Sequence, residues 1–240
     1  MQEIKPLKVS KRLPWIDTAR GFAILGIFMI NIATFNGPYF LYGNGQHMWG
    51  PGQSSTLHAL IDIFVQASFY SLFSFLFGFG MYIIYNNTQA KQLEKPNALL
   101  VKRLVILLII GMVHAFLLWH GDILISYAII GFLLLLFMRQ SNTSLLVWSL
   151  CMLIIPSALF SGLLYLTTSF VDNESLVNQA AIDASIQNYG AGTWGDILGQ
   201  NLKDWFIANN PFTYFFLILN LLPIFLLGLM FAKNKWLHDI

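Results

Sequence analysis

Long uninterrupted apolar runs, separated by shorter polar segments, dominate the chain. Runs such as 104–110 and 129–137 do not alternate apolar and polar residues, so they do not fit the strands of a membrane barrel. A helix needs roughly 17–25 residues to cross a hydrocarbon core of about 30 Å. The pattern therefore predicts six membrane-spanning helices, at about 14–35, 60–85, 103–120, 122–138, 145–169 and 212–232.

Two longer polar segments connect predicted spans on the outer, periplasmic side of the membrane. Residues 36–57 are rich in Gly, Pro, Gln and aromatic residues. Residues 170–211 form a loop in which Trp194–Asn209 has the pattern of an interfacial helix, anchored by residues such as Trp205 and Phe206. Neither segment looks like a folded domain, so we expect residues 1–240 to form a single transmembrane domain.

Composition does not fit a soluble domain. Hydrophobic residues make up 57% of the chain and charged residues only 10%, with a mean hydropathy of +0.65, whereas soluble domains are about one quarter charged. The formal net charge of +2 is too small to indicate nucleic-acid binding. The one cysteine, Cys151, excludes an intrachain disulfide, and five scattered histidines make a dedicated metal site unexpected.

The positions of Lys and Arg predict the orientation in the membrane, because cytoplasmic loops carry an excess of these residues. With six crossings, eleven of the 13 Lys and Arg residues fall on the side of the N-terminus, while Lys203 falls outside and Arg20 lies within a span. We therefore expect an all-α, polytopic transmembrane helical bundle with both termini in the cytoplasm. The eleven are Lys5, Lys8, Lys11, Arg12, Lys91, Lys95, Lys102, Arg103, Arg139, Lys233 and Lys235.

The first span carries three polar residues on one face. Ionisable residues inside a membrane cost several kcal/mol unless they are paired or hydrated, so each is a functional candidate. Asp17 and Arg20 are three residues apart, and Asn31 follows Arg20 by eleven residues, about three turns, so all three point the same way. In the alternative interpretation, Asp17 stabilises the helix N-terminus and Arg20 reaches the cytoplasmic head groups.

The second span begins with a stripe of polar residues at every fourth position. The stripe consists of His58, Asp62, Gln66, Tyr70 and Ser74. The spacing of His58 and Asp62 allows a carboxylate to orient an imidazole and raise its basicity. In the alternative interpretation, residues 56–66 lie flat at the outer interface and these side chains are simply hydrated.

The third polar group surrounds a predicted tight outer hairpin. His120 and Asp122 lie at its turn, where Asp122 either orients a histidine or caps the following helix. His114 lies about 1.5 turns below, inside an apolar helix, and needs a partner there. We expect that partner from another helix, with Asn31, Asp62 and Gln66 as candidates; a purely structural histidine is the alternative.

Three blocks of this sequence together suggest a family. They are Arg12-Leu-x-x-Ile-Asp17-x-x-Arg20-Gly21 with Asn31, Leu72-Phe-Ser-Phe-Leu-Phe-Gly78-Phe-Gly80, and Gly111-x-x-His114-x-x-x-x-Trp119-x-Gly121-Asp122-Ile-Leu-x-x-Tyr127. These blocks resemble the YeiB-like bacterial inner-membrane proteins. The resemblance covers roughly residues 12–138. Members of that family are longer, with further spans after the position where this sequence stops, so we expect this chain to be truncated.

The opening helix of the YeiB-like family is similar to that of transmembrane acyltransferases such as heparan glucosaminide N-acetyltransferase. This resemblance implies an acyl-CoA donor, such as acetyl-CoA, bound from the cytoplasm. It also implies that a histidine in the membrane passes the acyl group to a small-molecule or glycan acceptor on the other face. Asp17, Arg20 and Asn31 match the opening motif, but His47 and His58 are both out of register with the outer-loop histidine of those enzymes.

The leading hypothesis is that the protein moves an acyl group from cytoplasmic acyl-CoA to an acceptor at the outer face of the bacterial inner membrane. The candidate catalytic residues are His114 and His58, as base or acyl carrier, oriented by Asp62 or Asp122. The candidate residues for binding donor or substrate are Asp17, Arg20, Asn31, Gln66 and Tyr127.

A transporter or exporter of a small amphiphile is the alternative hypothesis. In that case the same polar residues form a pathway and the histidines relay protons. A third hypothesis is a non-catalytic membrane scaffold. Under each hypothesis the lipid bilayer surrounds the chain, an oligomer is compatible with the sequence, and neither nucleic acid nor a metal ion is an expected partner.

Overall fold

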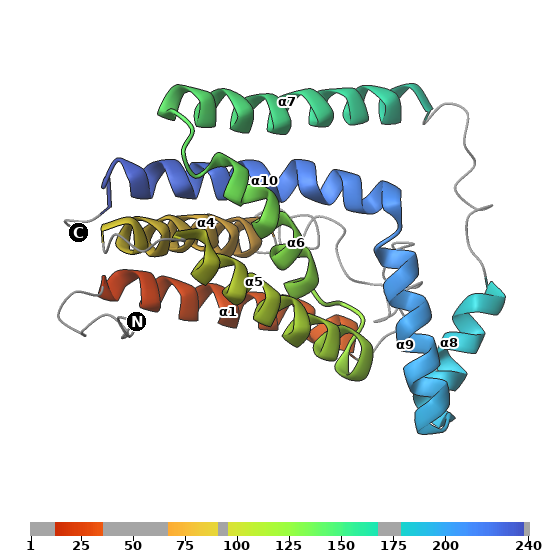
Figure 1. Ribbon diagram of the computed structural model, residues 1–240. Helices are drawn as coiled ribbons and strands as arrows, with labels where there is room; N and C mark the ends of the chain where they lie inside the picture. Colours follow the sequence, from red (N-terminus) through yellow and green to blue (C-terminus); the bar gives the residue numbers. More distant parts are fainter. Residues whose placement is uncertain (1–12, 36–66, 91–95, 168–178, 238–240) are drawn as a thin grey trace.

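The computed structural model describes residues 13–35, 67–90, 96–167 and 179–237, and these segments form an all-α helical bundle without strands. Eight α-helices lie in them (Figure 1). They are α1 (Pro14–Phe35), α4 (Ala67–Ala90), α5 (Pro96–Val113), α6 (Leu124–Leu134), α7 (Asn142–Thr167), α8 (Gln179–Ala191), α9 (Trp194–Ala208) and α10 (Pro211–Lys233). A π-helical turn, His114–Leu118, extends α5, and a 3-10 turn, Leu135–Phe137, extends α6. The predicted fold class is confirmed.

In the described segments, five helices are long and apolar enough to cross a membrane, namely α1, α4, α5 with its π turn, α7 and α10. The protein is therefore an integral membrane protein. These helices coincide with five predicted spans, although α4 continues to Ala90 and α5 begins at Pro96, before the predicted 103. Residues 60–66 of the predicted second span lie outside the described residues.

The predicted span at 122–138 is shorter than expected. It is the 11-residue α6 with its three-residue 3-10 turn, which together cover about 20 Å at roughly 1.5 Å per residue. The segment nevertheless joins opposite ends of the bundle. At one end the His114 ring pairs with Asp122, and at the other the Lys233 ammonium donates to the Gln140 carbonyl at 2.6 Å.

The central helix of the bundle is α10, which lies between α4 and α7 and also packs on α6 (Figure 1). Glycines allow α4 and α10 to approach closely: a Cβ at Gly78 would collide with the Phe225 carbonyl, and one at Gly228 with the Phe75 carbonyl. The core between α4, α5, α6 and α10 is apolar and fully buried. It includes Leu100, Leu104, Tyr127, Ile130, Phe225 and Leu226.

Helix α1 lies at the side of the bundle, packs on α4, and leaves much of its apolar surface uncovered. Phe22, Leu25 and Met29 are each more than half exposed, as expected for side chains that face lipid. Helix α7 is similarly exposed along its outer face and is tied to α10 through Ser149, whose buried hydroxyl donates to the Pro223 carbonyl at 3.1 Å.

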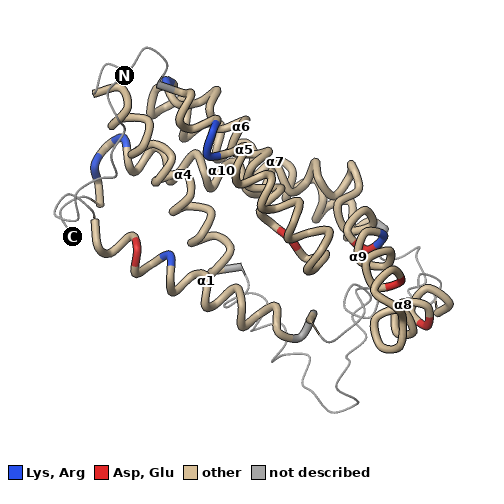
Figure 2. Tube along the Cα trace, turned by 60° about the horizontal axis from the view of Figure 1, so that its bottom comes forward, with Lys and Arg blue, Asp and Glu red and all other residues tan. Residues whose placement is uncertain are grey.

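Most Lys and Arg residues lie toward the end of the bundle that holds the chain ends, and most Asp residues lie toward the opposite end, near α8 and α9 (Figure 2). One end holds both described chain ends, because the Trp15 indole donates to the Leu237 carbonyl at 2.9 Å. Lys233 lies here at the end of α10 and donates to the Gln140 carbonyl next to Arg139, and Arg103 lines one cavity together with Lys235, so we call this end the basic end. The opposite end holds α8, α9 and the connection between the π turn and α6. We call it the hairpin end.

Helices α8 and α9 occupy the segment predicted as a loop with one interfacial helix. The predicted helix at Trp194–Asn209 is confirmed as α9, whereas α8 was not predicted. A capping box starts α9: the Thr193 hydroxyl accepts from the Asp196 N–H at 3.4 Å, and the Asp196 carboxylate accepts from the Thr193 N–H at 2.8 Å. Trp194 is 77% exposed, as an interfacial anchor would be.

Candidate functional site

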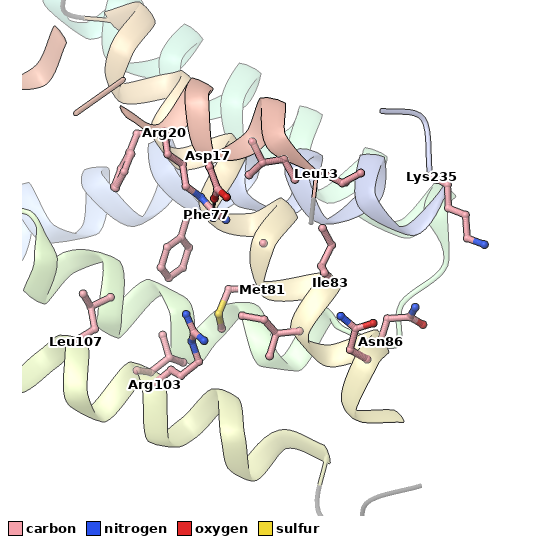
Figure 3. A pocket seen from close by; sticks show the side chains of 16 residues that line it. Leu13, Asp17, Arg20, Phe77, Met81, Ile83, Asn86, Arg103, Leu107 and Lys235 are labelled. Carbon is pink, nitrogen blue, oxygen red and sulfur yellow. Dashed lines mark ion pairs between the residues drawn. The ribbon is translucent and has the colours of Figure 1, made fainter. Parts of the chain in front are cut away.

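A cavity of about 840 Å³ opens at the basic end between α1, α4 and α5 (Figure 3). Apolar residues, among them Phe73, Phe77 and Leu107, form one part of its wall. The polar part consists of Asp17 and Arg20 from α1, Asn86 and Asn87 from α4, Arg103 from α5, and Lys235 after α10. Among the described residues that line it, three cations and one carboxylate make the cavity suited to the anionic part of an amphiphilic ligand.

Arg20 is held in the cavity by two contacts. Its Nη1 lies 3.6 Å from Asp17 Oδ1, and its Nη2 donates to the Leu76 carbonyl of α4 at 3.4 Å. The predicted pairing of Asp17 and Arg20 is confirmed. Both side chains are more than one third exposed, so the pair itself contributes little to stability. Gly80 leaves room for the guanidinium, since a Cβ there would meet Arg20 Nη2.

Other predicted polar residues connect helices. The Asn31 amide donates to the Tyr70 hydroxyl at 3.0 Å, which joins α1 to α4. The Ser74 and Tyr127 hydroxyls lie 2.6 Å apart and join α4 to α6, with Tyr127 only 1% exposed. The structure thus gives Asn31 and Tyr127 interhelical partners, and the binding roles suggested for them stay predictions.

Three predicted site residues lie outside the part of the chain that the structure describes. They are His58, Asp62 and Gln66. Their suggested roles, as base, orienting carboxylate and binding residue, therefore stay predictions.

His114 pairs with Asp122 across the hairpin rather than with the expected Asn31, whereas the other two expected partners, Asp62 and Gln66, lie outside the described residues. His114 Nδ1 lies 2.9 Å from Asp122 Oδ1, and the other carboxylate oxygen accepts from the Ile125 N–H at 2.9 Å. Asp122 therefore both orients the imidazole and caps α6. An ionised carboxylate only accepts hydrogen bonds, so the neutral tautomer that fits this pair has the proton on Nδ1 and the lone pair on Nε2. The Asp122 side chain is fully buried, whereas that of His114 is 35% exposed.

Two local features bring these residues together. The π turn His114–Leu118 ends at Trp119, whose N–H donates to the His114 carbonyl at 2.9 Å and whose backbone is extended. Such turns occur frequently at functional sites. Gly111 lets α5 approach the start of α6, because a Cβ there would lie 2.7 Å from the Ile125 nitrogen.

His114 and the cavity lie on the same face of α5. Leu104 and Leu107 line the cavity, and Gly111 and His114 continue the same face at seven and ten residues after Leu104. Seven residues separate Leu107 from His114, which is about 10 Å along a helix. The carboxylate-oriented imidazole therefore lies about two turns beyond the apolar wall of the cavity.

A second buried polar cluster, at the hairpin end, includes residues that the sequence did not single out. The Tyr189 hydroxyl donates to Asp204 Oδ2 at 2.8 Å and lies 3.4 Å from His120 Nδ1. The Gln200 amide donates to Asp204 Oδ1 at 2.8 Å, and Asp204 is fully buried. The four-residue spacing of Gln200 and Asp204 was the available sequence signal, but a polar pair on a helix ordinarily faces water.

Burial and hydrogen bonding shift the pKa values in this cluster. His120 is 6% exposed, and desolvation lowers its pKa below the ordinary value, although the Asp204 charge and a hydrogen bond with Asn201, which favours the protonated imidazole, oppose the shift. Desolvation and, as a smaller contribution, the hydrogen bond to Asp204 raise the pKa of Tyr189 well above its ordinary range. At neutral pH the imidazole is therefore uncharged and the phenol keeps the proton that it donates to Asp204.

Comparison with known proteins supports the assignment of this chain to a YeiB-like family. No family model and no solved structure matches the chain. The uncharacterized protein YxaH of Bacillus subtilis is 35% identical over this whole chain and 62% of its own length. The uncharacterized protein YeiB of Escherichia coli is 32% identical over 48% of this chain and 28% of its own length. An uncharacterized 39.9 kDa protein in the amylase 3′ region of Bacillus acidopullulyticus is 30% identical over 67% of this chain and 44% of its own length.

The chain thus spans less than two thirds of the length of each of these relatives. None of these three relatives is named for an activity. The resemblance to acyltransferases therefore stays a hypothesis.

Proposed function

We propose that this YeiB-like integral membrane protein transfers an acyl group from acyl-CoA, bound at the basic end, toward an acceptor at the opposite face. One observation carries the proposal: a cation-lined cavity and a carboxylate-oriented histidine share one face of α5. Acyl-CoA is an anionic amphiphile, and the cavity has a basic opening and an apolar wall that match its two parts. The proposal takes the basic end as cytoplasmic, where acyl-CoA is found.

In this proposal the donor binds through its negative charges. Arg20 and Arg103 offer planar guanidinium groups, which bind phosphate oxygens in pairs, and Lys235 lies at the edge of the cavity (Figure 3). Asp17 holds Arg20 in position without neutralising the cavity, since Asp17 is the one carboxylate among its described lining residues, beside Arg20, Arg103 and, at the edge, Lys235. The acyl arm then follows the wall formed by Phe77 and Leu107.

His114 acts as the general base in the proposed reaction. Its Nε2 takes the proton of an acceptor hydroxyl or amine while the acceptor atom forms a bond to the thioester carbonyl carbon. The C–S bond breaks, and the proton passes from the imidazolium to the leaving sulfur. Asp122 holds Nδ1 and stabilises the imidazolium. Acyl transfer through His114 Nε2 itself uses the same orientation and differs by a covalent acyl-imidazole.

The test is release of free CoA thiol by the purified full chain in lipid nanodiscs, with a bacterial membrane extract as source of acceptor. His114→Gln should abolish turnover and leave thermal unfolding unchanged. Gly80→Ala should raise KM at least about tenfold and leave kcat similar, because the added methyl displaces Arg20. Gly21→Ala is the matched control, since no heavy atom lies within 4 Å of its added methyl. No thiol release from any acyl-CoA would refute the proposal.

Transport of a small amphiphile is the second candidate, and the presence of cavities at both ends of the bundle favours it. Under this function the chain would move an amphiphile across vesicles without releasing thiol. Proton-coupled uptake together with absent thiol release would select transport over transfer.

A further inference from the structure

A second cavity, of about 470 Å³, lies at the hairpin end and has no assigned ligand. It is enclosed by the connection after α5 and by α8 and α9, and its volume falls within the range of small-molecule sites, roughly 300–1,000 Å³. Its aromatic lining includes Phe35, Trp119, Tyr189 and Trp194. We call it the hairpin pocket.

Two buried hydrogen-bond donors in the hairpin pocket lack partners among the described residues. They are the indole Nε1 of Trp119 and the hydroxyl of Ser185, which is fully buried. A buried donor without an acceptor costs about 1–3 kcal/mol, so such donors are usually satisfied by protein, water or ligand. Both residues line the pocket, and a bound molecule with hydrogen-bond acceptors would satisfy them.

The charge of the lining limits the head group of that molecule. No Lys, Arg, Asp or Glu is among the residues that line the pocket in the described part of the chain. The titratable residues in its lining are His120 and Tyr189. His120 is uncharged at neutral pH, and the Tyr189 hydroxyl already donates its hydrogen bond to Asp204. An anionic head group would find no cation, and a quaternary ammonium would leave both donors unsatisfied.

The remaining wall favours an apolar tail. Leu117, Leu118 and Ile186 line the pocket and are each more than half exposed. These side chains carry the apolar surface from the pocket to the outside of the bundle, where the exposed indole of Trp194 has the character of an interfacial residue. A molecule in the pocket can therefore keep its chain in the lipid.

We propose that the hairpin pocket binds an uncharged amphiphile whose head group accepts hydrogen bonds from Trp119 Nε1 and Ser185 Oγ. The head group would also lie beside His120, which lines the same pocket. Under the proposed function this ligand is the acyl acceptor, a statement that rests on that function. The binding itself does not, because it requires no acyl donor.

The test uses three decyl amphiphiles that differ only in the head group: 1-decylglycerol, decyl phosphate and decyltrimethylammonium. Each is titrated, below its critical micelle concentration, into nanodiscs that contain the full chain, with empty nanodiscs as blank. We expect saturable binding of 1-decylglycerol, at least tenfold tighter than that of either charged probe. Equal or tighter binding of a charged probe would overturn the proposal, as would no saturable binding of 1-decylglycerol.

Two variants locate the binding. Trp119→Phe removes the indole donor and keeps a ring, and Ser185→Ala removes the hydroxyl; each should weaken 1-decylglycerol binding about five- to tenfold, the effect of one lost hydrogen bond. The matched controls are Trp148→Phe and Ser144→Ala, which lie outside the pocket. Wild-type affinity in both pocket variants would overturn the proposal. No acyl-CoA is present in this binding assay, so a failure of acyl transfer leaves its result unaffected.

Discussion

Asp122 combines two roles that substitution can separate. One carboxylate oxygen pairs with His114 and the other caps α6 through the Ile125 N–H. Asp122→Asn keeps an oxygen for the cap but loses the charge that stabilises an imidazolium. We expect turnover to fall at least about 100-fold with little change in thermal unfolding.

Asp122→Ala should in addition lower the free energy of unfolding by about 2–3 kcal/mol, because it leaves buried donors unpaired. Thiol release and thermal unfolding of both variants are the measurements. Wild-type turnover in Asp122→Asn would show that the pair with His114 is structural only.

The burial of His120 predicts that the stability of the folded protein depends on pH. Its pKa lies below the ordinary 6.5, chiefly because burial disfavours the charged imidazole. The unfolded chain therefore binds a proton more readily than the folded chain, so stability falls as pH decreases below about 6.5 toward the native pKa. Asp204 and Tyr189 face the same imidazole.

The measurement is the difference in melting temperature between pH 7.5 and pH 5.5. It should be smaller in His120→Gln than in the wild type. An identical difference in the two proteins would mean that His120 does not titrate in this way.

At the scale of elements, the crossing of α4 and α10 depends on glycines. A methyl group at Gly78 or Gly228 would collide with a backbone carbonyl of the facing helix, which cannot move as a side chain can. We expect Gly78→Ala and Gly228→Ala each to lower the free energy of unfolding by about 1–3 kcal/mol through overpacking.

Gly162→Ala on α7 is the control, because no heavy atom lies within 4 Å of its added methyl. It should be neutral or slightly stabilising, since Ala favours a helix over Gly. Chemical unfolding of the three variants checks this, and equal stability of Gly78→Ala and Gly162→Ala would contradict the described crossing.

The length of the apolar runs predicted most of the helices. The helix that it did not predict, α8, has a polar sequence. The spans corresponding to α1, α7 and α10 follow directly from run length. Helix α8 was missed because its sequence, with Gln179, Asp183 and Asn188, resembles a hydrated loop. Only tertiary contacts reveal that one face of it is buried.

The same limit applies to the candidate site. The spacing of Asp17 and Arg20 predicted their pairing because both lie on one helix. Asp122 was one of two carboxylates suggested to orient a catalytic histidine, but the partner of His114 was expected from another helix, because the sequence does not show that a π turn and the close approach at Gly111 bring Asp122 back to it. The cluster around Asp204 depends on a contact between Tyr189 and His120, which are 69 residues apart in sequence, and carries no comparable signal.

At the scale of the whole molecule, the basic end predicts the topology. It contains both described chain ends, and positively charged residues remain in the cytoplasm. Reporter fusions at Asn142 and Lys233 should therefore report a cytoplasmic location, and a fusion at Asn188 in α8 a periplasmic one. A periplasmic signal at Lys233 would contradict the six crossings, including the short one through α6.

The central claim is that acyl-CoA enters at the basic end and that its acyl group leaves toward the hairpin end. The most direct measurement compares sealed inside-out and right-side-out membrane vesicles, each given acyl-labelled CoA from outside. Inside-out vesicles expose the basic end, so they should release thiol and retain labelled product inside. The His114→Gln protein should do neither. Turnover confined to right-side-out vesicles would contradict the account.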